Sequence, residues 1–336
     1  MIDLQNGSSA VVEAMRRRQF LGLLGGAALA WPRAAEAQQS KKLHRIGLLR
    51  VGPPPRSFIE PFRDSLRELG HVEDRTVVLE YALGRSVDEL PGIAADLVRR
   101  KVDVIVASGT PAVLPARDAT RSIPVVFVAA VDPIAIGLVR SLARPGGNVT
   151  GLTGVFADLV GKRLELLKEA FPTITRVVLL SRKENPGHEQ YVGAAQRASR
   201  TLGLQLQVVT ANSPDDFEAA FRAAEGAGAI VPVDDAMFTS HRQILVALAI
   251  TNRIPAVYGV REFVEIGGLM ALGANYSDLY RRAAGYVDKI LKGTSPAELP
   301  IQQPAKFELT INAKTAKALG LNIPPQLLAR ADEVIE

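Results

Sequence analysis

The sequence predicts an α/β protein with two doubly wound parallel-sheet lobes joined by a multi-strand hinge. Short runs of β-branched residues alternate with amphipathic stretches, which is the pattern of βαβ units on a parallel sheet. The same series of elements occurs twice along the chain. A chain of 336 residues is also long enough to form two domains, each with its own hydrophobic core.

Each half of the chain opens with a strand, a helix stopped by a glycine, and a second strand. Glycine just past the last helical residue is the expected C-terminal stop, because it adopts the left-handed conformation at little cost. In the first half these elements are residues 45–49, residues 57–69 before Gly70, and residues 76–81; in the second half they are residues 176–180, residues 189–202 before Gly203, and residues 205–210.

The parallel continues with a helix and an apolar strand, then a further helix and an Ile-Pro pair that opens another strand. The helix–strand pairs are 90–101 with 102–107 and 215–226 with 229–233, and the later strands are 123–128 and 254–258. Two consecutive units of this design predict two similar lobes that face each other. A single long sheet is the alternative.

The lobe boundaries follow from the irregular segments. We expect an N-terminal lobe of residues 44–150 plus 306–336, a C-terminal lobe of residues 151–280, and a crossover and linker region at 281–305. Crossings between the lobes are expected at 144–148 (Arg-Pro-Gly-Gly-Asn) and at 267–278. The tail, with a strand at 307–311 and a helix at 313–319, is expected to return to the first lobe.

The first 37 residues have the pattern of an export signal peptide. Three arginines at 16–18 precede an apolar run to Ala30, and Ala35-Glu36-Ala37 is a small-x-small cleavage site. The apolar run is too short for a permanent membrane anchor, and its glycines disfavour the alternative of an amphipathic helix. We therefore expect cleavage near Ala37 and a periplasmic protein. A start at Met1 or at Met15, and export by the twin-arginine or the general secretory route, both fit this pattern.

Composition and missing motifs exclude several classes of function. The chain has no cysteine, hence no disulfide, thiolate metal site or lipidation site. The formal net charge is +5, but lysines and arginines are scattered among acids, so we expect no nucleic-acid partner. Phosphate loops, nucleophile elbows and metal-binding histidine pairs are absent from the sequence. We therefore expect no enzyme, no catalytic residue, no cofactor and no metal.

Candidate ligand-binding residues follow the strands, because ligands of open α/β sheets bind beyond the carboxyl ends of the strands. Thr110, Asp132 and Asn185 each follow a predicted strand and precede a proline, so each is placed to begin a helix whose N-terminus attracts an anion. Plain helix capping is the alternative at each position. Further polar residues lie near these caps: Arg50, Ser108, Arg182, Lys183, Asp234, Asp235, Tyr258, Arg261 and Asn275.

Both charge signs occur in this set, which favours a zwitterion such as an amino acid, or a small carboxylate. Asp234 and Asp235 are alternatively a metal site or a catalytic pair. Adjacent residues at an extended strand end point in opposite directions, so at most one of the two is expected to face the cleft.

Four segments resemble one family: residues 102–112, 141–151, 261–269 and 306–336. Together they are similar to the tryptophan-binding-protein-like family of ABC transporter substrate-binding proteins, which has the type I periplasmic binding protein fold. The strings SLARPGGNVTG and KTAKALGL are the most specific. The resemblance covers nearly the whole chain after the signal peptide.

This resemblance implies a solute receptor that delivers its ligand to an inner-membrane ABC permease, and we expect it to act as a monomer. It places ligand contacts at Ser108, Gly109 and Thr110, at Asp132, in the loop 182–185, and at Asp234. The third loop departs from the family pattern, since Arg182 and Lys183 stand where amino-acid-binding members carry serines. The full set of expected ligand-binding residues is Ser108, Gly109, Thr110, Asp132, Arg182, Lys183, Asn185, Asp234, Tyr258, Arg261 and Asn275. A ligand-sensing module, or an enzyme that uses Asp132, Asp234 or Glu262 as acid or base, are the alternatives.

Overall fold

The computed structural model describes residues 43–154, 156–304 and 306–336. The predicted signal peptide lies outside these residues. None of the helices in the described ranges is long and apolar enough to cross a membrane.

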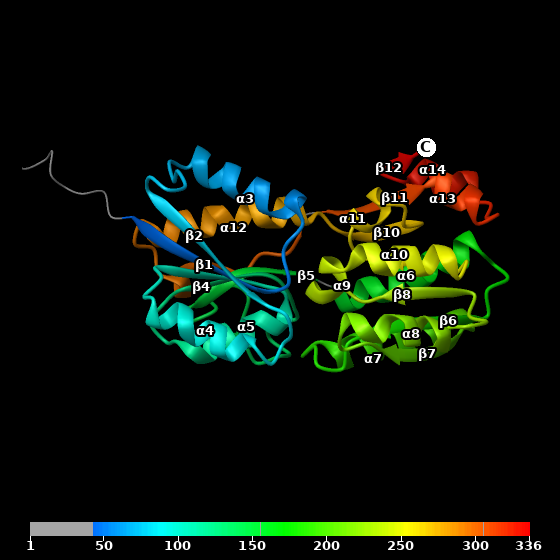
Figure 1. Cartoon of the computed structure of the whole chain (residues 1–336), viewed down its shortest axis with the longest axis horizontal. Helices are drawn as coiled ribbons and strands as arrows, with labels where there is room; N and C mark the ends of the chain where they lie inside the picture. The colour runs from blue at the N-terminus through cyan, green and yellow to red at the C-terminus, as the bar shows by residue number, and fades with distance from the viewer. Residues whose placement is uncertain (1–42, 155, 305) are drawn as a thin grey trace, which may run out of the picture. The chain divides into compact units, whose positions relative to one another are not determined.

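The first lobe is built on a five-stranded parallel sheet of order β2-β1-β3-β4-β5. Helices α3 and α12 pack together on one face of this sheet, and α4 and α5 cover the other (Figure 1). Every residue of β4 is buried, as expected for a strand covered on both faces. The strands are β1 (His44–Val51), β2 (Val77–Gly84), β3 (Val104–Ser108), β4 (Val125–Val131) and β5 (Val149–Gly154); the helices are α3 (Arg56–Glu68), α4 (Leu90–Arg99), α5 (Thr110–Ala119) and α12 (Tyr276–Leu291).

The second lobe contains a parallel sheet of order β7-β6-β8 and a mixed sheet of order β12-β11-β10-β9. A bridge between Ile230 and Ala256 joins β8 to the start of β9, so the two sheets are continuous. The strands are β6 (Arg176–Ser181), β7 (Gln205–Thr210), β8 (Ala229–Pro232), β9 (Val257–Tyr258), β10 (Met270–Ala274), β11 (Phe307–Asn312) and β12 (Glu333–Ile335).

The remaining helices belong largely to this second lobe and include two short 3-10 turns. In chain order they are α6 (Phe156–Ala170), α7 (His188–Leu202), η1 (Pro214–Asp216), α8 (Phe217–Ala223), α9 (Ala236–Ser240), α10 (Arg242–Thr251), α11 (Glu262–Glu265), η2 (Pro296–Glu298), α13 (Ala313–Ala318) and α14 (Pro325–Arg330). The duplicated α/β architecture predicted from the sequence is confirmed. Gly203 caps α7 in the left-handed conformation, as its position indicated.

The tail of the chain differs from the prediction. Strand β11 pairs antiparallel with β10 and parallel with β12, so residues 306–336 extend the second sheet instead of returning to the first lobe. Arg330 also forms an ion pair with Glu169 of α6. The helix that does return is α12, whose apolar face packs on α3 and β4. This corrects the expectation that residues up to 280 belong to the C-terminal lobe and that 281–305 are a crossover and linker region. The packing of α12 on the first lobe depends on contacts with distant segments, which the local sequence did not indicate.

The first crossing between the lobes also lies later than expected. Residues 149–154 form the last strand of the first sheet, so the chain leaves this lobe after Gly154 and not at 144–148. The second crossing occurs at Asn275, between β10 and α12, within the predicted range 267–278. A third follows Gln302, which bonds to β5 through Gly151 before the chain enters β11. In the described part of the chain, the path therefore passes between the lobes three times.

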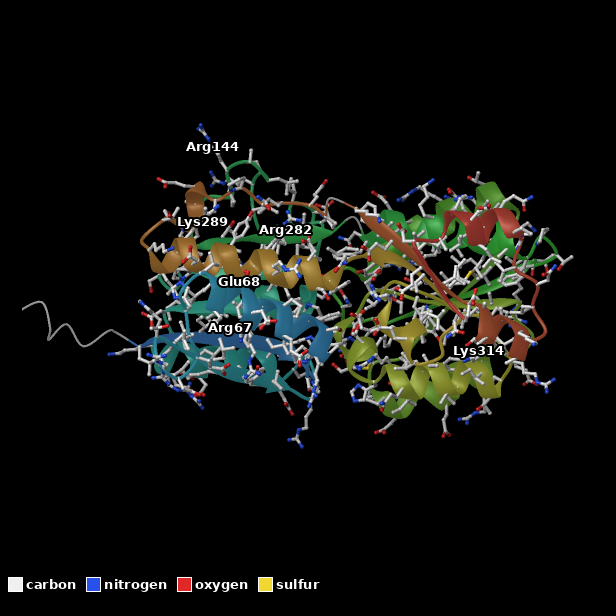
Figure 2. All side chains as sticks on the ribbon, turned by 90° about the horizontal axis from the view of Figure 1, so that it is seen from above. Arg67, Glu68, Arg144, Arg282, Lys289 and Lys314 are labelled. Atoms are coloured by element: carbon white, nitrogen blue, oxygen red, sulfur yellow. The ribbon has the colours of Figure 1, made fainter. Side chains whose placement is uncertain are left out.

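Charged side chains of both signs are interspersed on the surface. Arg67 and Glu68 are neighbours on α3, and the arginines and lysines that Figure 2 labels lie on several different elements. This arrangement agrees with the mixed surface inferred from the sequence. The absence of a nucleic-acid partner stays a prediction.

Candidate functional site

A small cavity lies where the carboxyl ends of strands from both lobes meet. It is lined from the first lobe by Arg50 near the end of β1, by the segment 108–111 that begins at the last residue of β3, and by Phe58 and Tyr276. From the second lobe it is lined by Asn185, Asp234 and Asp235. The volume of this cavity is about 20 Å³, so protein side chains nearly fill the site.

The segment after β3 forms the first-lobe wall. Ser108 is buried and its hydroxyl is hydrogen-bonded to the hydroxyl of Tyr280 at 2.6 Å. The Thr110 hydroxyl accepts a hydrogen bond from the Val131 backbone N–H at 2.9 Å, which ties the start of α5 to the end of β4. Gly109 has a φ of +82°, a conformation that favours glycine at this turn. The loop is therefore held rigidly against the strand ends.

Asp235 connects three segments of the second lobe. Its carboxylate accepts hydrogen bonds from the Met237 backbone N–H at 2.7 Å, capping α9, and from the Asn185 side chain at 2.7 Å. The Arg182 guanidinium lies 3.3 Å away, and both side chains are at most 1% exposed. Asp235 thus fixes the loop after β6 to the loop after β8.

Asp234 pairs with a different arginine. Arg163 of α6 approaches its carboxylate at 2.8 Å, and the two side chains are 0% and 2% exposed. Asp234 and Asp235 both line the cavity, which corrects the expectation that at most one of them faces the cleft. The chain turns into α9 directly after β8, so the two side chains do not follow the alternation of a continuing strand.

Arg163 was not among the residues expected from the sequence. Its Nε donates to the Leu272 carbonyl at 2.9 Å, and Gly259 leaves room for the pair. A Cβ at Gly259 would lie 1.9 Å from Asp234 Oδ1 and 2.3 Å from Arg163 Nη2. One signal was available in the sequence, because Arg163 occupies the apolar face of its helix, next to Val160 and Leu164.

Arg50 reaches from the first lobe to α9 of the second. Its guanidinium donates to the Ser240 hydroxyl at 3.0 Å, to the Ala236 carbonyl at 3.3 Å and to the Gly52 carbonyl at 3.1 Å. Burial lowers the pKa of this guanidinium from its usual value. Arg50 therefore forms a direct bridge between the lobes at the edge of the cavity.

Aromatic side chains form the apolar side of the site. Phe58 of α3 stacks on Tyr276 with ring centroids 4.8 Å apart and an interplanar angle of 16°. The ring of Tyr280 also stacks on Phe58, with ring centroids 5.3 Å apart. Since Phe58 and Tyr276 line the cavity, the site offers an aromatic surface beside its polar groups.

Of the residues expected to bind ligand, the structure gathers Ser108, Gly109, Thr110, Asn185 and Asp234 around the cavity. Arg182 lies behind them, in contact with Asp235. The other five lie outside this cavity: Asp132, Lys183, Tyr258, Arg261 and Asn275.

Each of these five has a local environment that explains its position. Asp132 is exposed, accepts from the backbone N–H groups of the turn that follows it, and lines a separate cavity of about 460 Å³. Lys183 is exposed, and Tyr258 is buried against Phe263 at 4.4 Å. Arg261 pairs with two nearby glutamates, and Asn275 caps α12.

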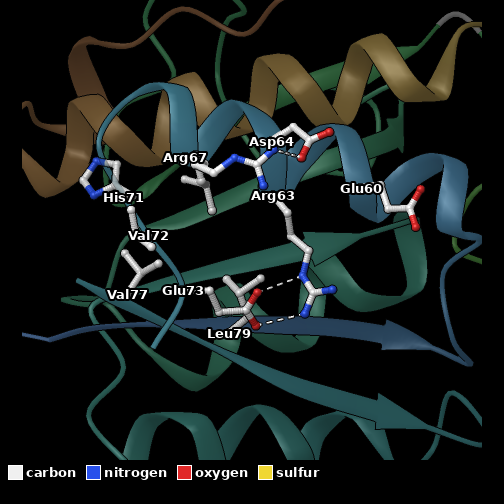
Figure 3. A pocket seen from close by; sticks show the side chains of 10 residues that line it. Glu60, Arg63, Asp64, Arg67, His71, Val72, Glu73, Val77 and Leu79 are labelled. Carbon is white, nitrogen blue, oxygen red and sulfur yellow. Dashed lines mark hydrogen bonds and ion pairs between the residues drawn. The ribbon is translucent and has the colours of Figure 1, made fainter. Parts of the chain in front are cut away.

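A further pocket of about 350 Å³ lies between α3 and β2 of the first lobe (Figure 3). Both of its arginines are paired with carboxylates of the same pocket. Arg63 pairs with Glu73 at 2.9 Å and Arg67 with Asp64 at 2.5 Å, as the dashed lines show. This pocket involves one lobe, and both of its arginines are already paired with its own carboxylates, so the cavity between the lobes is the stronger candidate site.

A second polar contact joins the lobes near the hinge. The Ser57 hydroxyl donates to Glu262 Oε1 at 2.7 Å, and Glu262 is only 3% exposed. Burial raises the pKa of Glu262, outweighing the hydrogen bond from Ser57, which lowers it. The folded protein therefore retains a proton on Glu262 at a pH where the unfolded chain has lost it.

Replacing Glu262 by glutamine should raise the free energy of unfolding relative to the wild type, and this gain should grow as pH rises. Because the native pKa is raised, the wild-type free energy of unfolding falls as pH rises from the ordinary carboxyl value of 4.5 through the raised value. Glu262→Gln removes that loss and can still accept from Ser57. We expect variant and wild type to unfold at similar urea concentrations near pH 4 and the variant to be more stable above pH 7. Glu265→Gln, on the same helix but 41% exposed, is the control. A pH-independent difference would contradict this assignment.

Comparison with known proteins places the chain in a class. Residues 55–335 match the family model described as ABC transporter substrate binding protein, which is most of the chain. The chain therefore belongs to the ABC transporter substrate-binding protein family. This confirms the family resemblance drawn from the sequence motifs.

Individual relatives agree with this class. The chain is 26% identical over 289 residues to a tyrosine-binding protein of Clostridioides difficile (strain R20291), a match that covers 84% of this chain and 82% of the relative. A solved conserved domain protein from Vibrio cholerae has a TM-score of 0.82 at 27% identity, covering 87% of this chain and 100% of that one. An ABC domain from Streptococcus pneumoniae in complex with L-Trp has a TM-score of 0.80 at 25% identity, covering 88% and 100%.

Proposed function

We propose that this protein is a periplasmic receptor that binds a small polar solute, an amino acid or a small carboxylate, between its two lobes. The ligand passes to an ABC permease of the inner membrane, and the receptor acts as a monomer after cleavage of its signal peptide near Ala37. The observation that carries the proposal is the cavity between the lobes, which buried polar side chains of both lobes line at the carboxyl ends of their strands.

Hinge closure is the proposed mechanism of binding. The free space of about 20 Å³ does not admit an amino acid, so the lobes must separate before a ligand can enter. Arg50 and Ser57 hydrogen-bond across to Ser240 and Glu262, and these contacts stabilise the closed arrangement. A ligand that contacts both lobes adds its own binding energy to the closed form and shifts the population toward it.

The comparisons support this ligand class. A tyrosine-binding protein and a domain crystallised with L-Trp are both similar to this chain over most of its length. The cavity combines charged groups with the stacked rings of Phe58 and Tyr276, which suits a polar solute with an apolar body.

A thermal-shift screen of the chain from residue 38 onward tests the proposal. Amino acids, aromatic acids and dicarboxylates form the main panel, with sugars and nucleosides as further classes. A ligand at a hundred times its Kd should add ~2.7 kcal/mol of stability. The ligand should be recovered chemically unchanged, and it should reduce the radius of gyration in solution scattering. The receptor proposal fails if no solute of any class raises the melting temperature, or if the ligand is converted.

A further inference from the structure

The charge balance of the cavity between the lobes limits which solute it can accept. Its two acidic residues each have a cationic partner, since Asp234 lies 2.8 Å from Arg163 and Asp235 lies 3.3 Å from Arg182. All four side chains are at most 2% exposed, so these charges are compensated inside the protein. A ligand ammonium group would therefore meet no uncompensated carboxylate here.

Arg50 is the cation in this cavity that lacks such a partner. It is 4% exposed, and among the described residues no carboxylate oxygen lies within 4.0 Å of its guanidinium nitrogens. Its hydrogen-bond acceptors are two backbone carbonyls and the Ser240 hydroxyl, all of them neutral. Its Nε has no hydrogen-bond partner in the described part of the chain. The cavity consequently carries one unbalanced positive charge.

A buried cation of this kind is costly unless an anion compensates it. Burial is the largest cause of the lowered pKa of Arg50, and the attraction of the more distant Asp235, which raises this pKa, does not offset it. A ligand carboxylate would neutralise the guanidinium and could accept from its unused Nε–H. An ammonium group in the same space would instead be repelled by it.

Asp234 adds a second requirement. Neither of its carboxylate oxygens accepts a hydrogen bond from the described residues, although Arg163 balances their charge. A neutral donor such as a hydroxyl group would satisfy these oxygens and leave the charge balance unchanged. The stacked rings of Phe58 and Tyr276 line the same cavity and suit an apolar substituent.

Resting on the receptor function proposed above, we infer that the ligand is a 2-hydroxy acid with an apolar side chain, not the corresponding zwitterionic amino acid. Its carboxylate pairs with Arg50, its hydroxyl donates to Asp234, and its apolar group lies against Phe58 and Tyr276. Three features of the same cavity carry this assignment: the unpaired cation, the unsatisfied but neutralised carboxylate, and the aromatic surface.

Calorimetric titration of the wild-type chain with matched pairs tests the inference. L-phenyllactate and L-phenylalanine differ only in a hydroxyl and an ammonium group, and the 2-hydroxy acid that corresponds to L-leucine gives a second pair with the amino acid. We expect the hydroxy acid of at least one pair to bind at least tenfold more tightly than its amino acid. Equal or tighter binding of the amino acids overturns the inference but leaves the receptor proposal intact. If a solute of another class binds and neither hydroxy acids nor amino acids do, the inference is also overturned and the receptor proposal is again left intact.

Variants of Arg50 test the anchor itself. Arg50→Gln should weaken binding of the hydroxy acid at least thirtyfold, and Arg50→Lys should retain part of the affinity because it keeps the charge. Arg56→Gln, an exposed arginine at the start of α3, is the matched control and should bind as the wild type does. Wild-type affinity in a folded Arg50→Gln overturns the anchor. If Arg50→Gln does not fold, the comparison of Arg50→Lys with the wild type decides, and there too unchanged affinity overturns it. Failure of every solute in the screen would contradict the receptor function as well.

Discussion

Replacing Arg163 by methionine should lower the free energy of unfolding by roughly 3–5 kcal/mol, because it leaves the Asp234 carboxylate buried without a counter-ion. The two side chains are 0% and 2% exposed, so water cannot take over the role of the guanidinium. The variant also loses the hydrogen bond from Nε to the Leu272 carbonyl. Urea unfolding at pH 7, followed by circular dichroism, measures the effect.

A double-mutant cycle measures the interaction between Arg163 and Asp234 separately from the other contacts of the two side chains. Asp234→Leu alone should be about as damaging, since it strands the buried guanidinium. The combination of Arg163→Met with Asp234→Leu should recover a large part of the loss, because well-packed apolar side chains often replace a buried ion pair at little cost. Additive losses in the double variant would show that the two side chains do not depend on each other. Arg330→Met, which breaks an exposed pair with Glu169, is the control and should cost less than about 1 kcal/mol.

Periodicity and strand ends predicted the lobes well because they depend on local sequence. The runs in β1 and β6, and glycine stops such as Gly203, are set by neighbouring residues. The sheet that the C-terminal tail joins could not be predicted in this way. Strand β11 carries the same alternation whichever sheet it joins, and its antiparallel pairing with β10 depends on contacts between segments more than thirty residues apart. The sequence pattern of β11 alone therefore does not indicate which sheet the strand joins.

The candidate site likewise contains residues that the local sequence predicted and residues that only long-range packing places there. The segment 108–110 and Asn185 follow strand ends, and the rule for open α/β sheets placed them at the cavity. Asp132 obeys the same rule, but its carboxylate accepts from the turn that follows it, and no helix begins there in the described chain, so Asp132 neither lines this cavity nor caps a helix. Arg163 lies in the middle of a helix, where no rule about strand ends applies. The partner of a buried charge can come from any element that packs against it, and only the packed structure identifies it.

The loss of Asp235 should be the second severe change. Asp235→Ala removes the partner of Arg182, whose side chain is 1% exposed, and the acceptor for the Asn185 side chain at 2.7 Å. It also removes the carboxylate that caps α9 by accepting a hydrogen bond from the Met237 N–H. A stranded buried cation costs roughly 3–5 kcal/mol, and a lost cap adds about 1 kcal/mol. We expect Asp235→Ala to unfold at a much lower urea concentration than the wild type.

Two variants assign this loss to its parts. Asp216→Ala removes a half-buried carboxylate that accepts from the Asn212 and Ser213 backbone N–H groups at the start of η1 and forms no ion pair with the described residues, so it should cost only about 1 kcal/mol. Asp235→Asn keeps an oxygen for the Met237 N–H but removes the charge opposite Arg182. It should therefore lose most of what Asp235→Ala loses, because the cation is the larger contribution. If Asp235→Asn is as stable as the wild type, the capping bond and not the buried charge pair is what fixes the loop after β8 to the loop after β6.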